Sequence, residues 1–147
     1  MNMKELFQTG ASFRTFILNQ KTAGRGSIMK HYIPMTVKDE DRLEIDKVST
    51  PLNILGIAEG DCPDCQISLA VLEKLISVNQ NINLRLITNK DAQGSMESFA
   101  GGTIKLPTFI FMNESFEEKA VIEGLPQASM TIDQIAELMR ETIKKTI

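Results

Sequence analysis

The chain holds only two cysteines, and both lie in one C-x-x-C motif, Cys62-Pro63-Asp64-Cys65. If two cysteines were placed at random in a chain of this length, this spacing would arise only on the order of once in a hundred chains. The motif follows a short apolar run, residues 52–58, and precedes a segment of helical periodicity. It therefore lies where a buried strand gives way to a helix, and its chemistry is either redox or metal binding.

Composition narrows the class of protein. A length of 147 residues with 42% hydrophobic content can form a core without disulfide or metal support. The net charge of −3 offers no basic surface for nucleic acid. Residues 1–18 interrupt their apolar positions with charges, and no segment has the apolar length of a signal peptide or a membrane span. We therefore expect a cytoplasmic protein with neither nucleic acid nor a membrane as partner. In that compartment, a close cysteine pair favours catalysis or metal binding over a structural disulfide.

Residues 1–49 are expected to form a helical extension without strands. The first segment carries an apolar stripe, and Thr36–Asp39 fits a capping box that opens a second helix. Residues 21–31, with Gly24, Gly26 and several basic side chains, are interpreted as a mobile basic loop between the two helices. The apolar stripe consists of Phe7, Phe13, Phe16 and Ile17.

Residues 50–147 show alternating strand and helix signals. Residues 52–58 form a nearly continuous apolar run, which is typical of a strand buried on both faces of a sheet. Pro63 stands in the first turn of a helix whose apolar face extends to Val78. The last helix opens with the capping box Thr131-x-x-Gln134. Between these helices we expect a strand at 84–88, a short helix at 95–100 stopped by Gly101-Gly102, and a hairpin of strands at 108–112 and 119–123.

This order of elements resembles the thioredoxin family over residues 50–147. A strand leads into a C-x-x-C at a helix start, a βαβ unit follows, and a later strand is entered through Leu106-Pro107. The segments "NILGIAEGDCPDC" and "KLPTFIFMNE" most resemble bacterial thioredoxin-like proteins with a helical extension. The resemblance implies an α/β thioredoxin-like fold. Its mixed central sheet, a parallel βαβ unit plus an antiparallel hairpin, would be flanked by helices. Residues 1–49 would be the extension and 50–147 the thioredoxin-like domain.

The resemblance also implies a thiol–disulfide oxidoreductase that reduces substrate disulfides and needs no cofactor. Cys62 matches the attacking cysteine and Cys65 the resolving one. Pro107 matches the proline that the family holds in the cis form, and Leu106 would present its backbone to a bound peptide. The expected partners are a disulfide-containing protein or a low-molecular-weight thiol, together with a reductase or thiol that recycles the pair. No glycine-rich nucleotide motif is present.

The chain departs from thioredoxin near the cysteines. Asp61 stands where thioredoxin has a tryptophan that contacts substrates, and Gly56 stands where it has a buried aspartate. Glu59 is the candidate replacement acid, expected at the end of the strand in solvent. Asp61, Asp64 and Glu59 form an acidic rim that disfavours a thiolate, whereas the helix N-terminus favours one. The dipeptide between the cysteines is Pro63-Asp64 rather than the Gly-Pro of thioredoxin. We expect the thiolate to be less favoured than in strongly oxidising relatives, which would make the pair a reductant rather than an oxidant.

Two other functions remain open from the residues. C-x-x-C is commonly half of a zinc site, but this chain lacks a second pair, and its only histidine, His31, lies in the expected loop. Zinc would need a site shared across a dimer or ligands such as Asp61 or Asp64. Alternatively, the protein is a redox-inactive binding module whose N-terminal helices contact a partner.

Overall fold

The computed structural model describes residues 2–96 and 104–147. Its centre is a mixed four-stranded sheet in the order β2-β1-β3-β4. Strands β1 and β2 are parallel, and β3 is antiparallel to both β1 and β4. This confirms the predicted βαβ unit and hairpin, with strand ends shifted by at most two residues. The strands are β1 (Leu52–Ile57), β2 (Ile82–Ile87), β3 (Thr108–Met112) and β4 (Glu118–Glu123).

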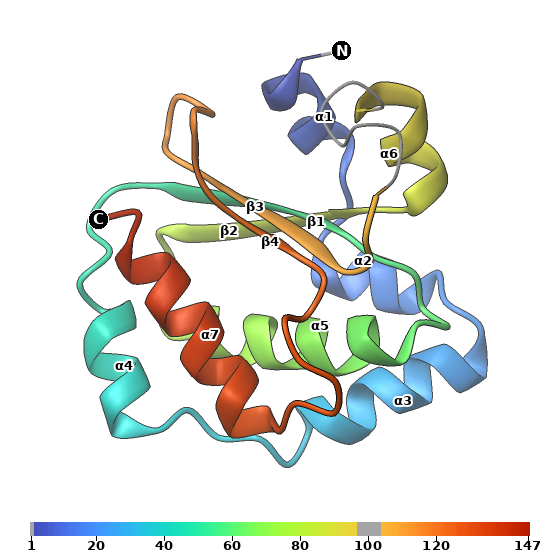
Figure 1. Cartoon of the computed structure of the whole chain (residues 1–147), viewed down its shortest axis with the longest axis horizontal. Coiled ribbons are helices and arrows are strands. Elements are labelled where there is room, and N and C mark those ends of the chain that lie inside the picture. Colours follow the sequence, from blue (N-terminus) through green and yellow to red (C-terminus); the bar gives the residue numbers. More distant parts are fainter. Residues whose placement is uncertain (1, 97–103) are drawn as a thin grey trace.

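Helices cover both faces of the sheet (Figure 1). One face carries α1 (Met3–Thr9) and α6 (Asn89–Met96). The other face carries α2 (Phe13–Leu18), α3 (Thr22–Tyr32), α4 (Asp39–Ile45), α5 (Pro63–Ile76) and α7 (Ile132–Lys144). None of the helices in the described residues is long and apolar enough to cross a membrane.

Two hydrophobic clusters explain this layering. Successive residues of a strand point to opposite faces, so Ile54 and Leu55 of β1 belong to different clusters. The larger cluster joins β1, β2 and β3 to α5 and α7, and it also takes in Phe16, Ile28 and Ile45 from α2, α3 and α4. The smaller cluster joins the opposite face to α1 and α6. The helices of residues 1–49 therefore contribute side chains to the same two hydrophobic clusters as residues 50–147.

The prediction of a loop at residues 21–31 was wrong, because most of that segment lies in α3. Two glycines make its intrinsic helix propensity low, and packing onto α5 compensates. Ile28 is fully buried, and the ammonium group of Lys74 lies 3.9 Å from the centre of the Tyr32 ring. His31 stands in the last turn of α3 and is half-buried, so it is not a loop residue.

Two other helix predictions also need correction. Helix α4 begins after Lys38, which makes no side-chain cap, so Thr36 does not open a capping box. Helix α6 spans Asn89–Met96 rather than 95–100, and the rest of that predicted helix, with Gly101-Gly102, lies outside the described residues. The earlier start has a local cause, since Thr88 Oγ1 accepts a hydrogen bond from the Asp91 N–H at 3.2 Å.

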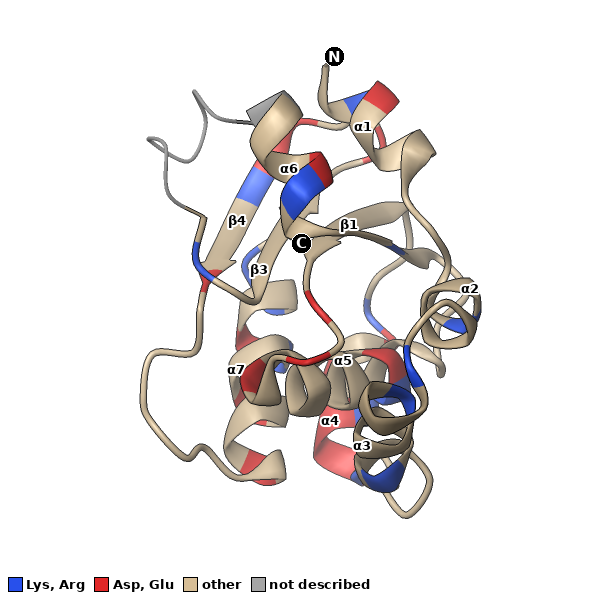
Figure 2. Ribbon diagram, turned by 90° about the vertical axis from the view of Figure 1, so that its right-hand side faces the viewer, with Lys and Arg blue, Asp and Glu red and all other residues tan. Residues whose placement is uncertain are grey.

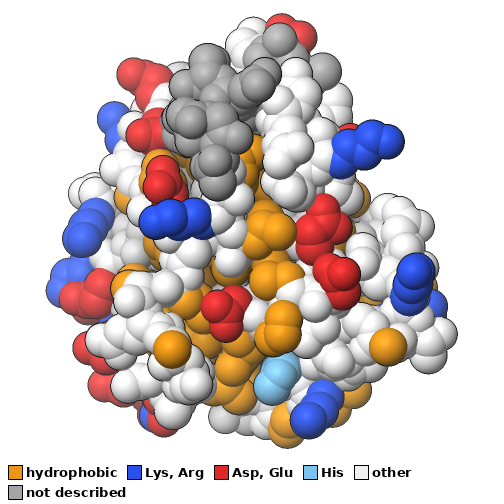
Figure 3. Space-filling view, turned by 45° about the vertical axis from the view of Figure 1, so that its right-hand side comes forward, with side chains coloured by type: hydrophobic (Ala, Val, Ile, Leu, Met, Phe, Trp, Pro, Cys, Tyr) orange, Lys and Arg blue, Asp and Glu red, His pale blue; other side chains and the backbone are white. Residues whose placement is uncertain are grey.

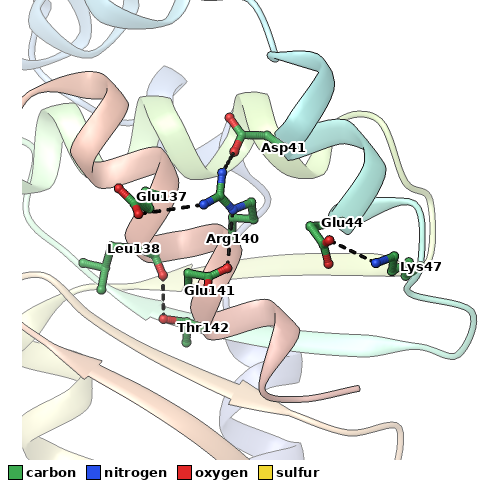
Figure 4. Close-up of polar contacts among 8 residues, drawn as sticks. All are labelled: Asp41, Glu44, Lys47, Glu137, Leu138, Arg140, Glu141 and Thr142. Carbon is green, nitrogen blue, oxygen red and sulfur yellow. Dashed lines mark hydrogen bonds and ion pairs between the residues drawn. The ribbon is translucent and has the colours of Figure 1, made fainter.

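Helix α7 begins as predicted, with the reciprocal capping box of Thr131 and Gln134. An ion pair connects it to α4, because Arg140 Nη1 lies 2.9 Å from Asp41 Oδ1 (Figure 4). The Asp41 side chain is only 5% exposed and that of Arg140 17%. The N-terminal region is therefore joined to the last helix by a polar contact as well as by the core.

Candidate active site

The cysteine motif lies at the start of α5, as the sequence predicts. Cys62 is the N-cap residue, and Pro63 occupies the first turn, where the missing N–H of a proline costs nothing. Cys62 is half-buried and Cys65 is fully buried, and both are free thiols. One cysteine is therefore accessible to a substrate, and the second lies one turn further into the protein.

The two cysteines are directly linked by a hydrogen bond. The Cys65 backbone N–H donates to Sγ of Cys62 at 3.2 Å, in the position that a serine or aspartate oxygen takes at many helix starts. The partial positive charge at the helix N-terminus acts on the same sulfur. Both the hydrogen bond and the helix terminus thus place positive partial charge beside the sulfur of Cys62.

Cys65 has the opposite environment. Burial raises the pKa of the Cys65 thiol well above its ordinary value, and its hydrogen bond with Cys62 and the negative charges of Cys62 and Glu59 add to the increase. A backbone hydrogen bond with Glu59 acts in the other direction. The buried Cys65 thiol therefore stays protonated at ordinary pH.

Leu106 and Pro107 lie at the same end of the sheet as the cysteines. Ile57 pairs with Thr108, so the segment after β1, which leads to Cys62, adjoins the segment before β3. The Leu106–Pro107 peptide bond is cis, as the resemblance implies. Pro107 is buried, whereas Leu106 is half-buried and packs against the larger hydrophobic cluster.

The acidic residues near the cysteines have different surroundings. Asp61 and Asp64 are exposed, and Figure 2 shows acidic residues on the loop between β1 and α5 and at the start of α5. Glu59 is not in open solvent as expected. It is half-buried, and its Oε1 accepts a hydrogen bond from the Asn89 N–H at 2.8 Å, which caps α6. Glu59 is thus fixed near Cys65 and contributes to the electrostatics of that thiol.

The structure also explains the glycine at position 56. A Cβ atom there would lie 2.7 Å from Cδ2 of Leu86 and 3.1 Å from Cε1 of Phe109. These distances leave no room for a carboxylate without repacking of the larger cluster. The space that an acidic side chain would need is filled by two apolar ones, so any acid that serves Cys65 must come from elsewhere.

A metal site has little support among the described residues. They contain no group of three or more His, Cys, Asp or Glu side chains placed to hold a metal ion. Asp61 and Asp64 are near the cysteines in sequence but do not complete a ligand set with them.

The N-terminal helices border the site, which the sequence did not indicate. A cavity of about 350 Å³ lies between residues 19–24 and the Glu59–Asp61 loop, directly before Cys62. The loop is also held by Gln66 of α5, whose Nε2 donates to the Gly60 carbonyl oxygen at 2.8 Å. In the sequence, Gln66 is recognisable only as a polar residue directly after the cysteine motif. That position does not reveal which group its side chain binds.

A mixed sheet with a C-x-x-C at the start of its crossover helix and a cis proline beside it defines a thioredoxin-like α/β protein. The chain belongs to the thioredoxin family, because a family model described as "Thioredoxin" matches residues 10–139. The match includes α2, α3 and α4 as well as the cysteine motif. No curated protein matches the chain significantly in sequence.

Solved structures show the same fold. A protein of unknown function from Pseudomonas aeruginosa is 19% identical with a TM-score of 0.90, covering 100% of this chain and 99% of its own. An HIV epitope-scaffold is 20% identical with a TM-score of 0.81, covering 99% and 92%. The NTD_N/C domain of the alkylhydroperoxide reductase AhpF from Enterococcus faecalis is 11% identical with a TM-score of 0.52, covering 79% and 53%. The first two similarities extend over the N-terminal helices too.

Proposed function

We propose that this protein is a thiol–disulfide oxidoreductase that reduces substrate disulfides through Cys62 and Cys65. The observation that carries the proposal is the hydrogen bond from the Cys65 N–H to Sγ of Cys62 at the start of α5. It stabilises a thiolate on the accessible sulfur, and the second thiol is one turn away and protected from solvent.

The reaction would have two steps. The Cys62 thiolate attacks one sulfur of the substrate disulfide, the S–S bond breaks, and the released substrate thiolate takes a proton from water. Cys65 then loses its proton and attacks Sγ of Cys62 in the mixed disulfide, which releases the second substrate thiol. Two electrons pass from the cysteine pair to the substrate, and the pair ends as an internal disulfide.

Glu59 is our candidate for accepting the Cys65 proton. Its charge is among the causes that raise the pKa of Cys65, so the two groups interact. Its carboxylate is held in place by the Asn89 N–H, and position 56 cannot supply an acid. A fixed carboxylate near a buried thiol suits general base catalysis in the second step.

The exposed hydrophobic side chains favour a protein as the substrate. Figure 3 shows a band of hydrophobic side chains across one face of the molecule, with acidic side chains beside it. Half-buried Cys62 and Leu106 both pack against the larger cluster and keep part of their surface accessible. The reducing direction suits the cytoplasm, where a reductase or a low-molecular-weight thiol would return the pair to the dithiol state.

One alternative has a specific observation in its favour. The chain lacks the buried acid at Gly56 and has Asp61 in place of tryptophan, so a thioredoxin-fold binding module with idle cysteines is the second candidate. In that case Cys62 and Cys65 would not interconvert between the dithiol and the disulfide.

A redox titration separates the two functions. The protein would be equilibrated in dithiothreitol buffers of graded potential, the free thiols alkylated, and the state of the pair read by mass spectrometry. We expect a reversible two-electron transition near about −270 mV, whereas a value above about −200 mV would indicate an oxidant or isomerase. The Cys62→Ser variant is the negative control, because it cannot form the internal disulfide. If the wild type does not form this disulfide at any potential either, the oxidoreductase proposal fails.

A further inference from the structure

The backbone of α3 packs directly against the backbone of the loop that leads to Cys62. A Cβ atom added at Gly24 would lie 2.7 Å from the carbonyl oxygen of Gly60 and 3.2 Å from its carbonyl carbon. Real Cβ atoms essentially never approach another heavy atom so closely, and a backbone oxygen cannot move aside as the end of a flexible side chain can. Only glycine at position 24 permits this contact.

Gly60 is also held by two glutamine side chains. The carboxamide of Gln20, which follows α2, occupies the place that a Cβ at Gly60 would take. Gln20 is itself fixed, because its Nε2 donates to the Phe16 carbonyl oxygen at 3.1 Å. Gln66 of α5 donates to the Gly60 carbonyl oxygen, the atom against which Gly24 packs. The peptide at Gly60 is therefore confined between the N-terminal helices and α5.

This confinement extends to the reactive sulfur through two short links. The Cys62 N–H donates to the Glu59 carbonyl oxygen at 3.3 Å, which closes the loop around Gly60 into a turn. Sγ of Cys62 then accepts the hydrogen bond from Cys65. A displacement of Gly60 would be passed to Cys62 through this turn, and the length of the Cys65 N–H to Cys62 Sγ hydrogen bond depends on where Cys62 lies relative to α5.

We propose that Gly24, together with Gln20 and Gln66, positions Cys62 for thiolate formation, so that α2 and α3 are a working part of the redox site. The inference rests on the proposed oxidoreductase function and adds to it. None of the three residues hydrogen-bonds to the sulfur of Cys62 or Cys65. They act through Gly60, and Figure 1 shows α3 beside α5 on the same face of the sheet.

The chain offers a matched pair of variants for the test. Gly24→Ala and Gly26→Ala change two glycines of the same helix and bring the same gain in helix propensity. A Cβ at Gly26 meets nothing within 4 Å, so only Gly24→Ala pushes on the loop. The readout is the rate at which iodoacetamide alkylates Cys62 in the reduced protein, followed by peptide mass spectrometry across a pH series.

We expect Gly24→Ala to slow alkylation by about tenfold below the midpoint of the pH profile and to move that midpoint to higher pH, because a thiolate that loses a hydrogen bond is less stable. The alkylation rate of Gly26→Ala should stay within about twofold of the wild type, because the added methyl group does not touch the loop. If folded Gly24→Ala keeps the wild-type profile, the positioning role is excluded.

A second variant covers the case in which Gly24→Ala does not fold. Gln66→Met keeps the size of the side chain but removes the donor to Gly60, and it should shift the alkylation profile in the same direction. A wild-type profile for Gln66→Met would then overturn the inference. The outcome stays separate from the proposed function, because alkylation needs no disulfide. If the wild type forms no disulfide in the redox titration, the oxidoreductase proposal fails. If the variants and the wild type have equal alkylation profiles, only the positioning role fails.

Discussion

The Cys65 N–H donates a hydrogen bond to Sγ of Cys62 over 3.2 Å, while the Cys65 thiol itself is fully buried. The backbone of one cysteine thus stabilises charge on the other, and burial raises the pKa of the Cys65 thiol. Two residues of the same type, three positions apart, thus have different surroundings because of the turn between them and their depth in the protein.

Alkylation should therefore distinguish the two cysteines. At about pH 7, iodoacetamide is expected to modify Cys62 at least about a hundredfold faster than Cys65, because the thiolate is the reactive form and Cys65 is protected by burial and a raised pKa. Peptide mass spectrometry on the native reduced protein would measure both rates. Equal rates in the native state, rather than only after denaturation, would contradict the assignment of Cys62 as nucleophile.

Removal of the resolving thiol should trap substrates. The Cys65→Ser variant can form the mixed disulfide but cannot release it, so covalent adducts on Cys62 should accumulate from a cell extract and disappear on treatment with dithiothreitol. The matched control is Cys62→Ser, which should yield none, because the remaining thiol is buried. Absence of Cys62-linked adducts in Cys65→Ser would count against exchange with proteins.

Glu59→Gln tests the proposed proton acceptor. Glutamine keeps an oxygen that can cap α6 through the Asn89 N–H, but it cannot take a proton. We expect release of the mixed disulfide to slow by about tenfold or more. The alkylation rate of Cys62 should change far less. Stopped-flow measurement of the two steps would separate these effects, and an unchanged release rate would remove Glu59 from the mechanism.

The ion pair between α4 and α7 should contribute to stability. In Arg140→Met, Asp41 stays buried without its partner, and we expect a loss of about 2 kcal/mol in the free energy of unfolding. Urea denaturation would measure it. Lys38→Met is the control, because the Lys38–Asp133 pair has a similar distance of 2.9 Å but is exposed, so its removal should have little effect. Equal effects of the two substitutions would show that burial of the pair does not matter.

Glu73 should make stability depend on pH. Burial raises the pKa of the Glu73 carboxyl above its ordinary value of 4.5. Below the ordinary value the group is protonated in both the folded and unfolded states. Stability is then lost as the pH rises through the folded pKa, because the buried group must become charged.

Glu73→Gln removes that charge. We therefore expect a higher Tm than wild type at about pH 7 and a difference that vanishes as the pH falls to about 3. Glu114→Gln, at an exposed position in the β3–β4 turn, is the control and should show no such trend. A Glu73→Gln Tm that stays below the wild type across the series would contradict the sign of this effect.

Local patterns in the sequence anticipated much of the fold. The continuous apolar run of β1, the proline in the first turn of α5 and the capping box of α7 are all recognisable without a partner, because each depends on residues within one element. Helix α3 was misread for the opposite reason. Its own glycines and charges favour a loop, and the contacts that stabilise it come from α5.

The site shows the same division. The sequence by itself determined that Cys62 would cap a helix with Cys65 one turn further on, since the C-x-x-C spacing and Pro63 act within that turn. Only the tertiary structure decided that Glu59 caps α6, that Leu86 and Phe109 fill the space beside Gly56, and that Gly24 packs against Gly60. These contacts join segments far apart in the chain, and close packing, which depends on the shapes of both partners at once, leaves no periodic signal in either segment.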